Sequence, residues 1–252
     1  MSELDRLLGS SAAVRQTKAK AERLLQGRSE RLPPVLLSGE TGTGKGLLAR
    51  SLHGDSARST RPFIEVNCSA IPEQLLEAEL FGFERGAFTD AHKPKAGLFQ
   101  LAHQGTLFLD EVALLPLHLQ PKLLKVLEDR AVRRLGGTQA EPADVWLIAA
   151  SNEDLARAVA EKRFRADLFH RLAVFPISLP PLRERDEDVL QLAEVFLGRA
   201  CAEYGLGHKV LSPEARAALC RHDFPGNVRE LANAIERAAL LSFGERIEAR
   251  TL

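Results

Sequence analysis

The sequence predicts an α/β fold, with a mostly parallel sheet between layers of helices, followed by a small all-helical domain. Short apolar segments that suit buried strands alternate with segments that suit helices, and this alternation is typical of a parallel sheet covered on both faces. After residue 180 every expected element is a helix. We therefore expect an α/β domain in residues 1–180 and a helical lid domain in residues 181–252.

Five segments have the composition of strands. The segment 106–109 is continuously apolar from Leu107 onward, as expected of a strand buried on both faces. The segment 174–177 contains Pro176, which cannot donate a backbone hydrogen bond and therefore favours an edge position. The complete set of expected strands is 35–38, 63–66, 106–109, 145–150 and 174–177.

The expected helices follow from apolar spacing and from residues that favour helix starts. Apolar residues recur at helical intervals in 11–26 and in 117–127. The second domain offers three further starts, because Ser and Asn favour the N-cap and Pro favours the first helical position. These starts are Glu187, Pro213 after the N-cap Ser212, and Asn227 with Glu230 as its capping partner.

The composition excludes several classes of protein. The 252 residues carry 34 Lys and Arg against 34 Asp and Glu, so the chain lacks the basic excess that non-specific DNA binding needs. No apolar run approaches the roughly 20 residues that span a bilayer, and the N-terminus does not resemble a signal peptide. Cys68, Cys201 and Cys220 have no metal-ligand spacing and suit reduced thiols. We expect a cytoplasmic protein that binds neither DNA nor membranes directly.

A glycine-rich segment between the first strand and a helix predicts a phosphate-binding loop. Glycines let consecutive backbone N–H groups turn toward an anion, the helix N-terminus adds a positive end, and the lysine supplies a point charge for the outer phosphates. A glycine-rich turn that binds nothing is the alternative. The expected nucleotide contacts are Gly39, Glu40, Thr41, Gly42, Thr43, Gly44, Lys45, Gly46 and Leu47.

One position in this loop departs from the usual pattern. Gly46 stands where a Ser or Thr hydroxyl commonly binds Mg²⁺. Asp110 and the phosphates of the nucleotide must then supply more of the coordination of the metal.

Two acids follow the apolar strand 106–109. Asp110 is expected to hold Mg²⁺ through water, and Glu111 is placed to polarise the water that attacks the γ-phosphate. Asn152, at the end of the strand 145–150, is a candidate sensor of that phosphate. Strand ends that turn into polar loops without any chemistry are the alternative. Phosphate sites in parallel sheets lie at the carboxyl ends of the strands, so these groups should share one edge.

These motifs belong to an ordered series along the chain. The sequence resembles the AAA+ domain of sigma-54-dependent transcription activators, the bacterial enhancer-binding proteins, over nearly its whole length. The resemblance implies a P-loop AAA+ three-layer sandwich with a helical lid. The segments that carry it are 8–11, 39–45, 81–82, 86–91, 164–168, 171–172, 179–185 and 224–231.

The resemblance implies an ATPase that uses ATP and Mg²⁺ and forms ring hexamers with the nucleotide between subunits. Leu8 and Gly9 would lie near the adenine, and Arg229 would sense the nucleotide from the lid. Arg165 and Arg171 would reach the site of the neighbouring subunit, although without the family a solvated helix face is the better interpretation of these two residues. Asn67, which could also be an ordinary strand end, would pair with Glu111 as a switch.

The resemblance also implies a partner. The segment Gly86, Ala87, Phe88, Thr89, Asp90 and Ala91 is similar to the family's GAFTGA loop, which engages the sigma-54 RNA polymerase holoenzyme. Gly86 before Phe88 and Thr89 after it favour an exposed loop over a core position for the aromatic ring. Asp90 replaces the second glycine of that motif, which adds a charge and removes conformational freedom. Gln100 and Gln104 stand where the family more often has Glu and Gly.

Three functions are compatible with these observations. The first is an ATP-driven activator of sigma-54 polymerase. The second is an AAA+ module that remodels another partner within a larger protein, which Asp90 leaves open. The third is a nucleotide-binding switch that assembles and barely hydrolyses, against which the intact Asp110, Glu111 and both arginines argue. Family members usually carry a sensory domain and a DNA-binding domain as well, so we expect a separate domain or a protein without a DNA reader.

Overall fold

The computed structural model describes residues 2–27, 31–89, 91–185 and 188–252. Its centre is a five-stranded sheet in the order β2-β3-β6-β1-β7, and all four neighbouring pairs are parallel. The predicted α/β fold with a mostly parallel sheet is confirmed. The strands are β1 (Val35–Ser38), β2 (Phe63–Asn67), β3 (Thr106–Asp110), β6 (Trp146–Ser151) and β7 (Phe175–Ser178).

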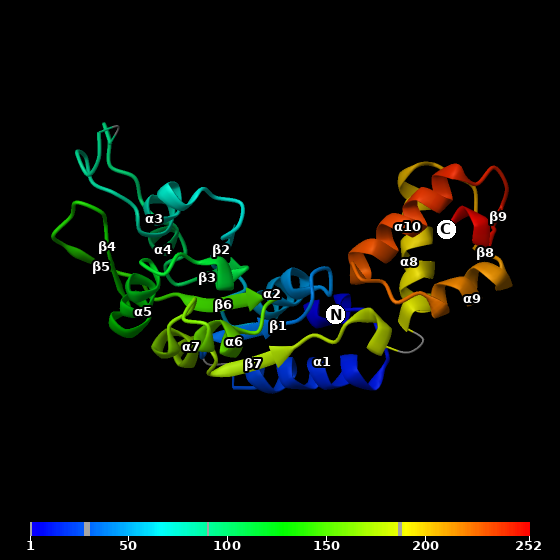
Figure 1. Cartoon of the computed structure of the whole chain (residues 1–252), viewed down its shortest axis with the longest axis horizontal. Coiled ribbons are helices and arrows are strands. Elements are labelled where there is room, and N and C mark those ends of the chain that lie inside the picture. Colours follow the sequence, from blue (N-terminus) through cyan, green and yellow to red (C-terminus); the bar gives the residue numbers. More distant parts are fainter. Residues whose placement is uncertain (1, 28–30, 90, 186–187) are drawn as a thin grey trace.

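Helices cover both faces of the sheet and make a three-layer sandwich (Figure 1). The 3₁₀-helix η1 (Glu3–Arg6), α1 (Ala12–Leu25) and α2 (Lys45–Gly54) pack on one face. The opposite face carries α3 (Glu73–Phe81), α4 (Leu98–Leu101), α5 (Gln120–Asp129), α6 (Leu155–Ala160) and α7 (Ala166–Leu172).

The alternation of side chains along β3 explains why this strand is continuously apolar. Leu107 and Leu109 pack in the core under α3 to α7, whereas Phe108 points into the core under α1 and α2. All three side chains are completely buried. A strand with helices on both faces needs apolar residues at every position, because successive side chains point to opposite faces.

The edge position predicted for the proline-containing strand is confirmed. β7 lies at one end of the sheet and, among the described residues, pairs with β1 alone. Its other side has no neighbouring strand to which Pro176 would have to donate a backbone hydrogen bond. The strand predicted at 35–38 is present with the same bounds. The other predicted strands and the helix at 117–127 are present with one or both ends shifted by one to three residues.

Several elements were not predicted. The strands β4 (Ala131–Arg133) and β5 (Ala140–Pro142) form a small antiparallel sheet, and α3, α6 and α7 also gave no signal that we recognised. β4 follows α5 with no glycine between them, because Arg130 itself adopts the left-handed conformation that ends the helix (φ 50°). The sequence pattern therefore contains no stop signal at this point.

The lid domain consists of α8 (Asp188–Glu203), α9 (Pro213–Arg221) and α10 (Asn227–Leu241) around its own apolar core. The predicted helical lid is confirmed, and it also contains one short pair of strands that was not predicted, in which β8 (Val210–Leu211) runs parallel to β9 (Arg246–Ile247). Strands of two residues are too short for an alternating pattern to show in the sequence. The predicted helix start at Glu187 falls on a residue outside the described ranges.

The predicted helix starts at Pro213 and Asn227 are confirmed, and only the N-cap residue of the second helix differs from the expectation. The Ser212 hydroxyl accepts the backbone N–H of Ala215, as an N-cap should. At α10 the N-cap is Gly226, whose N–H donates to the Glu230 carboxylate. Asn227 adopts a left-handed conformation (φ 54°), and its side chain bonds to other segments.

The segment between α3 and α4 extends away from the sheet beside the β4–β5 hairpin, at the end of the molecule opposite the lid (Figure 1). Its base is closed by reciprocal backbone hydrogen bonds between Phe83 and Lys95. Leu135, after β4, donates to Gly82 and accepts from Glu84, so the base is tied to the hairpin as well.

Substitution of Gly97 at this base should destabilise the protein, whereas substitution of Gly198 should not. A Cβ on Gly97 would lie 2.3 Å from the backbone nitrogen of Gly82 and 2.6 Å from the carbonyl oxygen of Leu80. Gly97→Ala should therefore lower the free energy of unfolding by about 1–3 kcal/mol, measured by urea denaturation.

Gly198 is the matched control, because it lies exposed inside α8 and an added Cβ meets no atom within 4 Å. Gly198→Ala should raise the free energy of unfolding by about 0.5–1 kcal/mol. Equal effects of the two substitutions would contradict the packing described for Gly97.

Candidate nucleotide-binding site

Three glycines of the loop after β1 have backbone angles that favour glycine. Gly39, Gly42 and Gly44 have φ values of 152°, 80° and 105°. A Cβ on Gly42 would also lie 2.2 Å from the carbonyl oxygen of Gly226 in the lid, so this glycine allows the lid to approach. The loop leads directly into the N-terminus of α2, a ten-residue helix, and this arrangement of N–H groups and helix dipole can hold phosphate.

The side chain of Lys45 folds back over the phosphate-binding loop that precedes it in the sequence. Its ammonium group donates to the carbonyl oxygens of Gly39 (2.8 Å) and Glu40 (3.2 Å), and the residue is only 6% exposed. Burial lowers the pKa of Lys45, while the nearby charges of Glu111 and Asp110 act in the opposite direction. The side chain thus arches over the loop, with both acids within electrostatic reach.

The sheet brings the predicted acids and sensor to the same edge. Glu111 follows β3 with a left-handed backbone (φ 54°), its N–H donates to the Asp110 carboxylate, and its own carboxylate accepts the N–H of Asn152 (3.4 Å). The amide of Asn152 donates to the Thr41 hydroxyl (3.1 Å). Residues from β1, β3 and β6 thereby converge, because the ends of parallel neighbours meet at one edge.

Asn67 ends β2 directly beside Asp110 in the strand register. Its side-chain oxygen accepts the N–H and the hydroxyl of Ser69, and no hydrogen bond to Glu111 is found among the described residues. The switch pairing of Asn67 with Glu111 stays a prediction. The next residue, Cys68, is buried, and burial together with the two acids raises the pKa of its thiol to about 12.

The donor set suits Mg²⁺ held together with a nucleotide. Within the described residues no group of three or more His, Cys, Asp or Glu could hold a metal by itself. Asp110 and Glu111 offer two adjacent carboxylates, and Mg²⁺ is commonly bound by one or two carboxylates, water and substrate phosphates. A Cβ on Gly46 would meet only Phe108, at 3.8 Å, so the missing hydroxyl is a matter of chemistry and not of space.

The predicted adenine segment is fixed to the lid. Asp188, at the start of α8, accepts the N–H groups of Ser10 (2.6 Å) and Ser11 (3.0 Å) and the Ser11 hydroxyl (2.7 Å). A Cβ on Gly9 would lie 2.4 Å from the Asp188 carboxylate, and Leu8 packs against the core of the lid. Asp188 was not among the predicted site residues.

Two arginines of the segment between the domains hold the phosphate-binding loop. Arg183 forms a bidentate ion pair with Glu40 (2.6 and 2.9 Å), and this contact, with a further hydrogen bond from Asn227, lowers the pKa of Glu40 to about 2. Arg185 is almost fully buried and donates to the carbonyl oxygen of Thr43 (2.7 Å). The sequence marked the segment 179–185 as part of the resemblance but assigned no role to either arginine.

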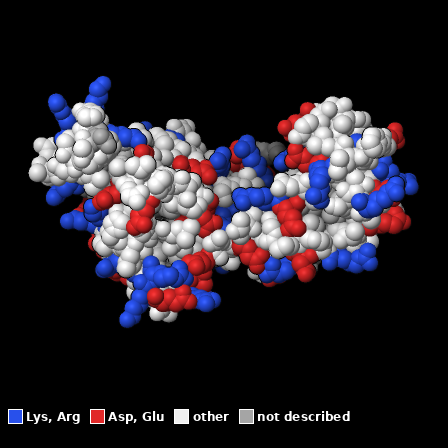
Figure 2. Space-filling view, turned by 45° about the horizontal axis from the view of Figure 1, so that its top comes forward, with Lys and Arg blue, Asp and Glu red and all other residues white. Residues whose placement is uncertain are grey.

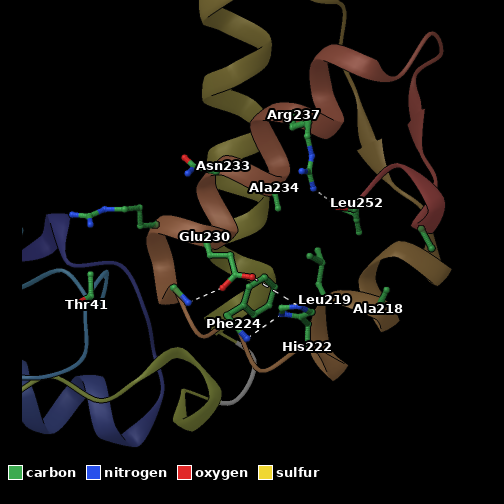
Figure 3. A pocket seen from close by; sticks show the side chains of 13 residues that line it. Thr41, Ala218, Leu219, His222, Phe224, Glu230, Asn233, Ala234, Arg237 and Leu252 are labelled. Carbon is green, nitrogen blue, oxygen red and sulfur yellow. Dashed lines mark hydrogen bonds and ion pairs between the residues drawn. The ribbon is translucent and has the colours of Figure 1, made fainter. Parts of the chain in front are cut away.

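Arg229 lies on α10 next to the phosphate-binding loop. A Cβ added to Gly42 would lie 3.2 Å from the Cβ of Arg229. Its charge also acts on Lys45, whose pKa it tends to lower. Both Arg229 and Thr41 line a cavity of about 760 Å³. Figure 3 shows that most of its other walls come from α9, α10 and the C-terminal residue Leu252.

Arg165 and Arg171 lie away from this loop in their own chain. Arg165 is the N-cap residue of α7 and pairs with Asp167 (2.6 Å), and Arg171 donates to the carbonyl oxygen of Leu127 (2.8 Å). Both arginines are exposed. No hydrogen bond among the described residues joins them to the phosphate-binding loop, so their role in hydrolysis stays a prediction that requires a second subunit.

The predicted partner loop is a turn with an exposed aromatic ring. Phe88 is 43% exposed and its ring contacts that of Phe83 at a centroid distance of 4.8 Å. The N–H of Gly86 donates to the carbonyl oxygen of Ala91, which closes the turn. Phe88 is therefore not a core residue, as expected, and Asp90 lies outside the described residues.

Charge is mixed over the face shown in Figure 2, where Lys and Arg atoms gather in the hollow between the two lobes with Asp and Glu atoms beside them. Among the described residues no helix has the length and apolar character needed to cross a membrane.

Comparison with known proteins identifies the family. Residues 7–178 match the family described as the sigma-54 interaction domain. The chain belongs to this family. Residues 183–252 match the AAA+ ATPase lid domain. The family resemblance noted from the sequence is confirmed, and the sigma-54 interaction domain described here has the AAA+ fold.

Relatives of the sigma-54 interaction domain include transcriptional regulators. The chain is 45% identical to the transcriptional regulatory protein FlgR of Helicobacter pylori over 97% of its own length and 63% of that protein. It is 47% identical to the response regulator FleR of Pseudomonas aeruginosa, covering 100% of this chain and 52% of FleR. The chain thus spans between about half and two thirds of these curated relatives.

A solved structure is similar throughout the chain. The crystal structure of NtrX from Brucella abortus in complex with ADP superposes with a TM-score of 0.89 at 37% identity, and covers 100% of this chain and 55% of that chain.

The pKa of Glu40 predicts how attachment of the lid depends on pH. The folded pKa of about 2 lies below the ordinary 4.5, so the ionised carboxylate stabilises the fold above pH 4.5 and loses this effect as the pH falls toward 2. The wild type should resist urea better than Glu40→Gln at pH 7, and this difference should shrink progressively below pH 4.5.

Arg183 provides the control, because it is the main cause of the low pKa. In Arg183→Gln protein the substitution Glu40→Gln should cost less stability and show a weaker pH dependence. A wild-type advantage that stays constant from pH 7 to pH 3 would contradict the role assigned to the ion pair.

Proposed function

We propose that this domain is an ATP-hydrolysing, ring-forming remodeller that engages sigma-54 RNA polymerase through the loop at 86–91 and activates transcription. The observation that carries the proposal is the convergence of Lys45, Asp110, Glu111 and Asn152 at one sheet edge, in a chain of the sigma-54 interaction domain family. The relatives FlgR and FleR are named as regulators, which supports a role in transcription.

The residues of the site divide the work of hydrolysis. The N–H groups of the loop, the N-terminus of α2 and Lys45 bind the phosphates, and Arg229 approaches them from the lid. Asp110 would hold Mg²⁺ through water, and the bound metal would neutralise charge on the phosphate oxygens. The Glu111 carboxylate, oriented by the Asn152 N–H, polarises the attacking water.

The hydrolysis site is completed by a second subunit. Arg165 and Arg171 are exposed on α7 and have no bond to the phosphate-binding loop of their own chain among the described residues. An arginine that reaches the γ-phosphate from a neighbour stabilises the developing charge, which is worth roughly 10³–10⁵ in rate in comparable enzymes. This division of labour makes ATP turnover depend on assembly into a ring of six.

The loop that carries Phe88 is the partner contact. It lies at the end of the molecule opposite the lid and presents a half-exposed aromatic ring (Figure 1). Exposed aromatic side chains at a loop tip dominate many protein interfaces.

We also propose that the functional boundary between the two domains lies near residue 180. Support comes from the separate apolar cores, since two clusters enclose the sheet and a third occupies the lid. Limited proteolysis that cuts first within 179–187 would agree with this boundary, and cleavage first inside β7 or α8 would contradict it.

Hydrolysis should be complementable between subunits. Glu111→Gln protein should bind ATP with near wild-type affinity and lose most turnover, because the water loses its polarising carboxylate, and Arg165→Ala protein should also be nearly inactive. Mixing the two should restore part of the phosphate release, since some interfaces regain both groups.

The control is a mixture of Lys45→Ala protein with Glu111→Gln protein. Both substitutions damage the part of the site that a subunit supplies to its own nucleotide, so this mixture should not recover activity. Turnover that is independent of protein concentration and is never restored by mixing would contradict the role of Arg165 across subunits.

Phe88 should separate hydrolysis from partner engagement. Phe88→Ala should retain ATPase activity near that of the wild type, because the ring lies in an exposed loop. The variant should lose co-elution with purified sigma-54 in the presence of a mimic of the ATP-hydrolysis transition state.

Phe243→Ala is the matched control, since Phe243 is fully exposed between α10 and β9 of the lid. The lid and the loop lie at opposite ends of the molecule (Figure 1), so this substitution should leave both activities intact. If the wild type itself fails to bind sigma-54, Asp90→Gly tests whether the charge in the loop is the cause. Binding by neither protein would contradict the proposed partner.

A further inference from the structure

Asn227 joins three segments of the chain that are far apart in sequence. Its side-chain oxygen accepts the N–H of Leu182 in the connection between the domains (2.8 Å). Its amide group donates to the Glu40 carboxylate (3.0 Å) and to the carbonyl oxygen of Thr41 (3.0 Å) in the phosphate-binding loop. The residue is completely buried, so water cannot replace these bonds.

The partners fix the orientation of the Asn227 amide. The Leu182 N–H can only donate, whereas the Thr41 carbonyl and the ionised Glu40 carboxylate can only accept. The oxygen must therefore face Leu182 and the nitrogen must face the loop. This set of partners requires one acceptor and two donors from a single short side chain.

Asparagine meets this requirement and the backbone requirement together. The residue has φ 54°, a left-handed conformation that Asn tolerates better than most residues with a Cβ. Aspartate would tolerate the backbone but would place a carboxylate oxygen against Glu40. Serine could not reach both sides, and alanine would leave the Leu182 N–H and the Thr41 carbonyl without their partner.

Arg229 is two residues after Asn227, in the first turn of the same helix α10. The close contact of Gly42 with Gly226 leaves no room for this turn to approach the loop further. The bonds from Asn227 prevent the turn from moving away. Together they determine where the Arg229 side chain leaves the helix relative to Lys45 and the phosphates.

We propose that Asn227 is a positioning residue for nucleotide binding: its buried amide fixes the first turn of α10 to the phosphate-binding loop and thereby sets the position of Arg229. The proposal rests on the proposed function, since it assigns Arg229 a contact with the nucleotide. It also makes the position of the lid depend on the same loop that binds the phosphates.

The first test is the substitution Asn227→Gly, which keeps the left-handed backbone and removes only the side-chain bonds. Affinity for a non-hydrolysable ATP analogue should fall about 10-fold, because buried hydrogen bonds to a charged group and to the loop are lost. The loss should be absent in an Arg229→Ala background, because two residues that act through one contact are not additive.

A merely structural role gives a different result. It would lower the thermal midpoint of the nucleotide-free protein and would weaken binding to the same extent with and without Arg229. Glu236→Gln serves as the matched control on α10, because the Glu236 side chain bonds to Tyr204 within the lid and does not line the cavity that Arg229 and Thr41 share. This control should bind the analogue like the wild type.

A second test exchanges the amide donor of Asn227 and the carboxylate acceptor of Glu40, and it does not depend on the glycine variant. Asn227→Asp keeps the acceptor for Leu182 but opposes two carboxylates, and should weaken binding at least as much as Asn227→Gly. Adding Glu40→Gln supplies an amide that can donate to the new carboxylate, so the double variant should bind the analogue more tightly than Asn227→Asp alone.

The outcomes separate this proposal from the proposed function. If the wild type does not bind the ATP analogue, the proposed function fails. If the wild type binds but Asn227→Gly binds equally well, or its loss is additive with Arg229→Ala, or the exchange gives no rescue, the positioning role of Asn227 is overturned while the ATPase stands.

Discussion

The candidate site depends on the parallel pairing of β3, β6 and β1. These three strands are neighbours in the sheet although they lie far apart in sequence, and all point the same way. Their carboxyl ends therefore deliver the phosphate-binding loop, the acids at 110–111 and Asn152 to one edge. The first N–H of the loop, from Gly39, donates to the carbonyl oxygen of Ser151, so the loop begins as a continuation of this pairing.

The lid adds a second constraint, which acts through buried polar groups. Arg185, Asp188 and Asn227 are all nearly or completely inaccessible to solvent, and each bonds to a segment of the larger domain. A buried polar group without a partner costs about 1–3 kcal/mol, so these residues favour one arrangement of the lid over alternatives that would break the bonds. The predicted adenine segment and the glycine-rich loop are consequently both held from the lid.

The two ends of the molecule differ in structure. The candidate site lies between the sheet and the lid, whereas the loop with Phe88 projects at the opposite end, next to the β4–β5 hairpin (Figure 1). Between them lie β3 and the helices α3 and α5, which pack together in one continuous apolar core. Changes at the acids after β3 can therefore reach the loop only by shifting packed elements, which are rigid at this density.

The local features could be predicted from the sequence alone: the glycine-rich loop, the acids after a buried strand and the edge strand with Pro176. These features depend on residues close together in the chain, where backbone conformation and hydrophobic pattern are decided locally. The sequence could not reveal β8 and β9, whose two residues each are too few for a pattern. Nor could it reveal that Arg130 and Asn227 adopt left-handed conformations without being glycine. The roles of Arg183, Asp188 and Asn227 were decided only by the tertiary structure, because each bonds to a partner more than 100 residues away and such pairings have no periodicity in the sequence.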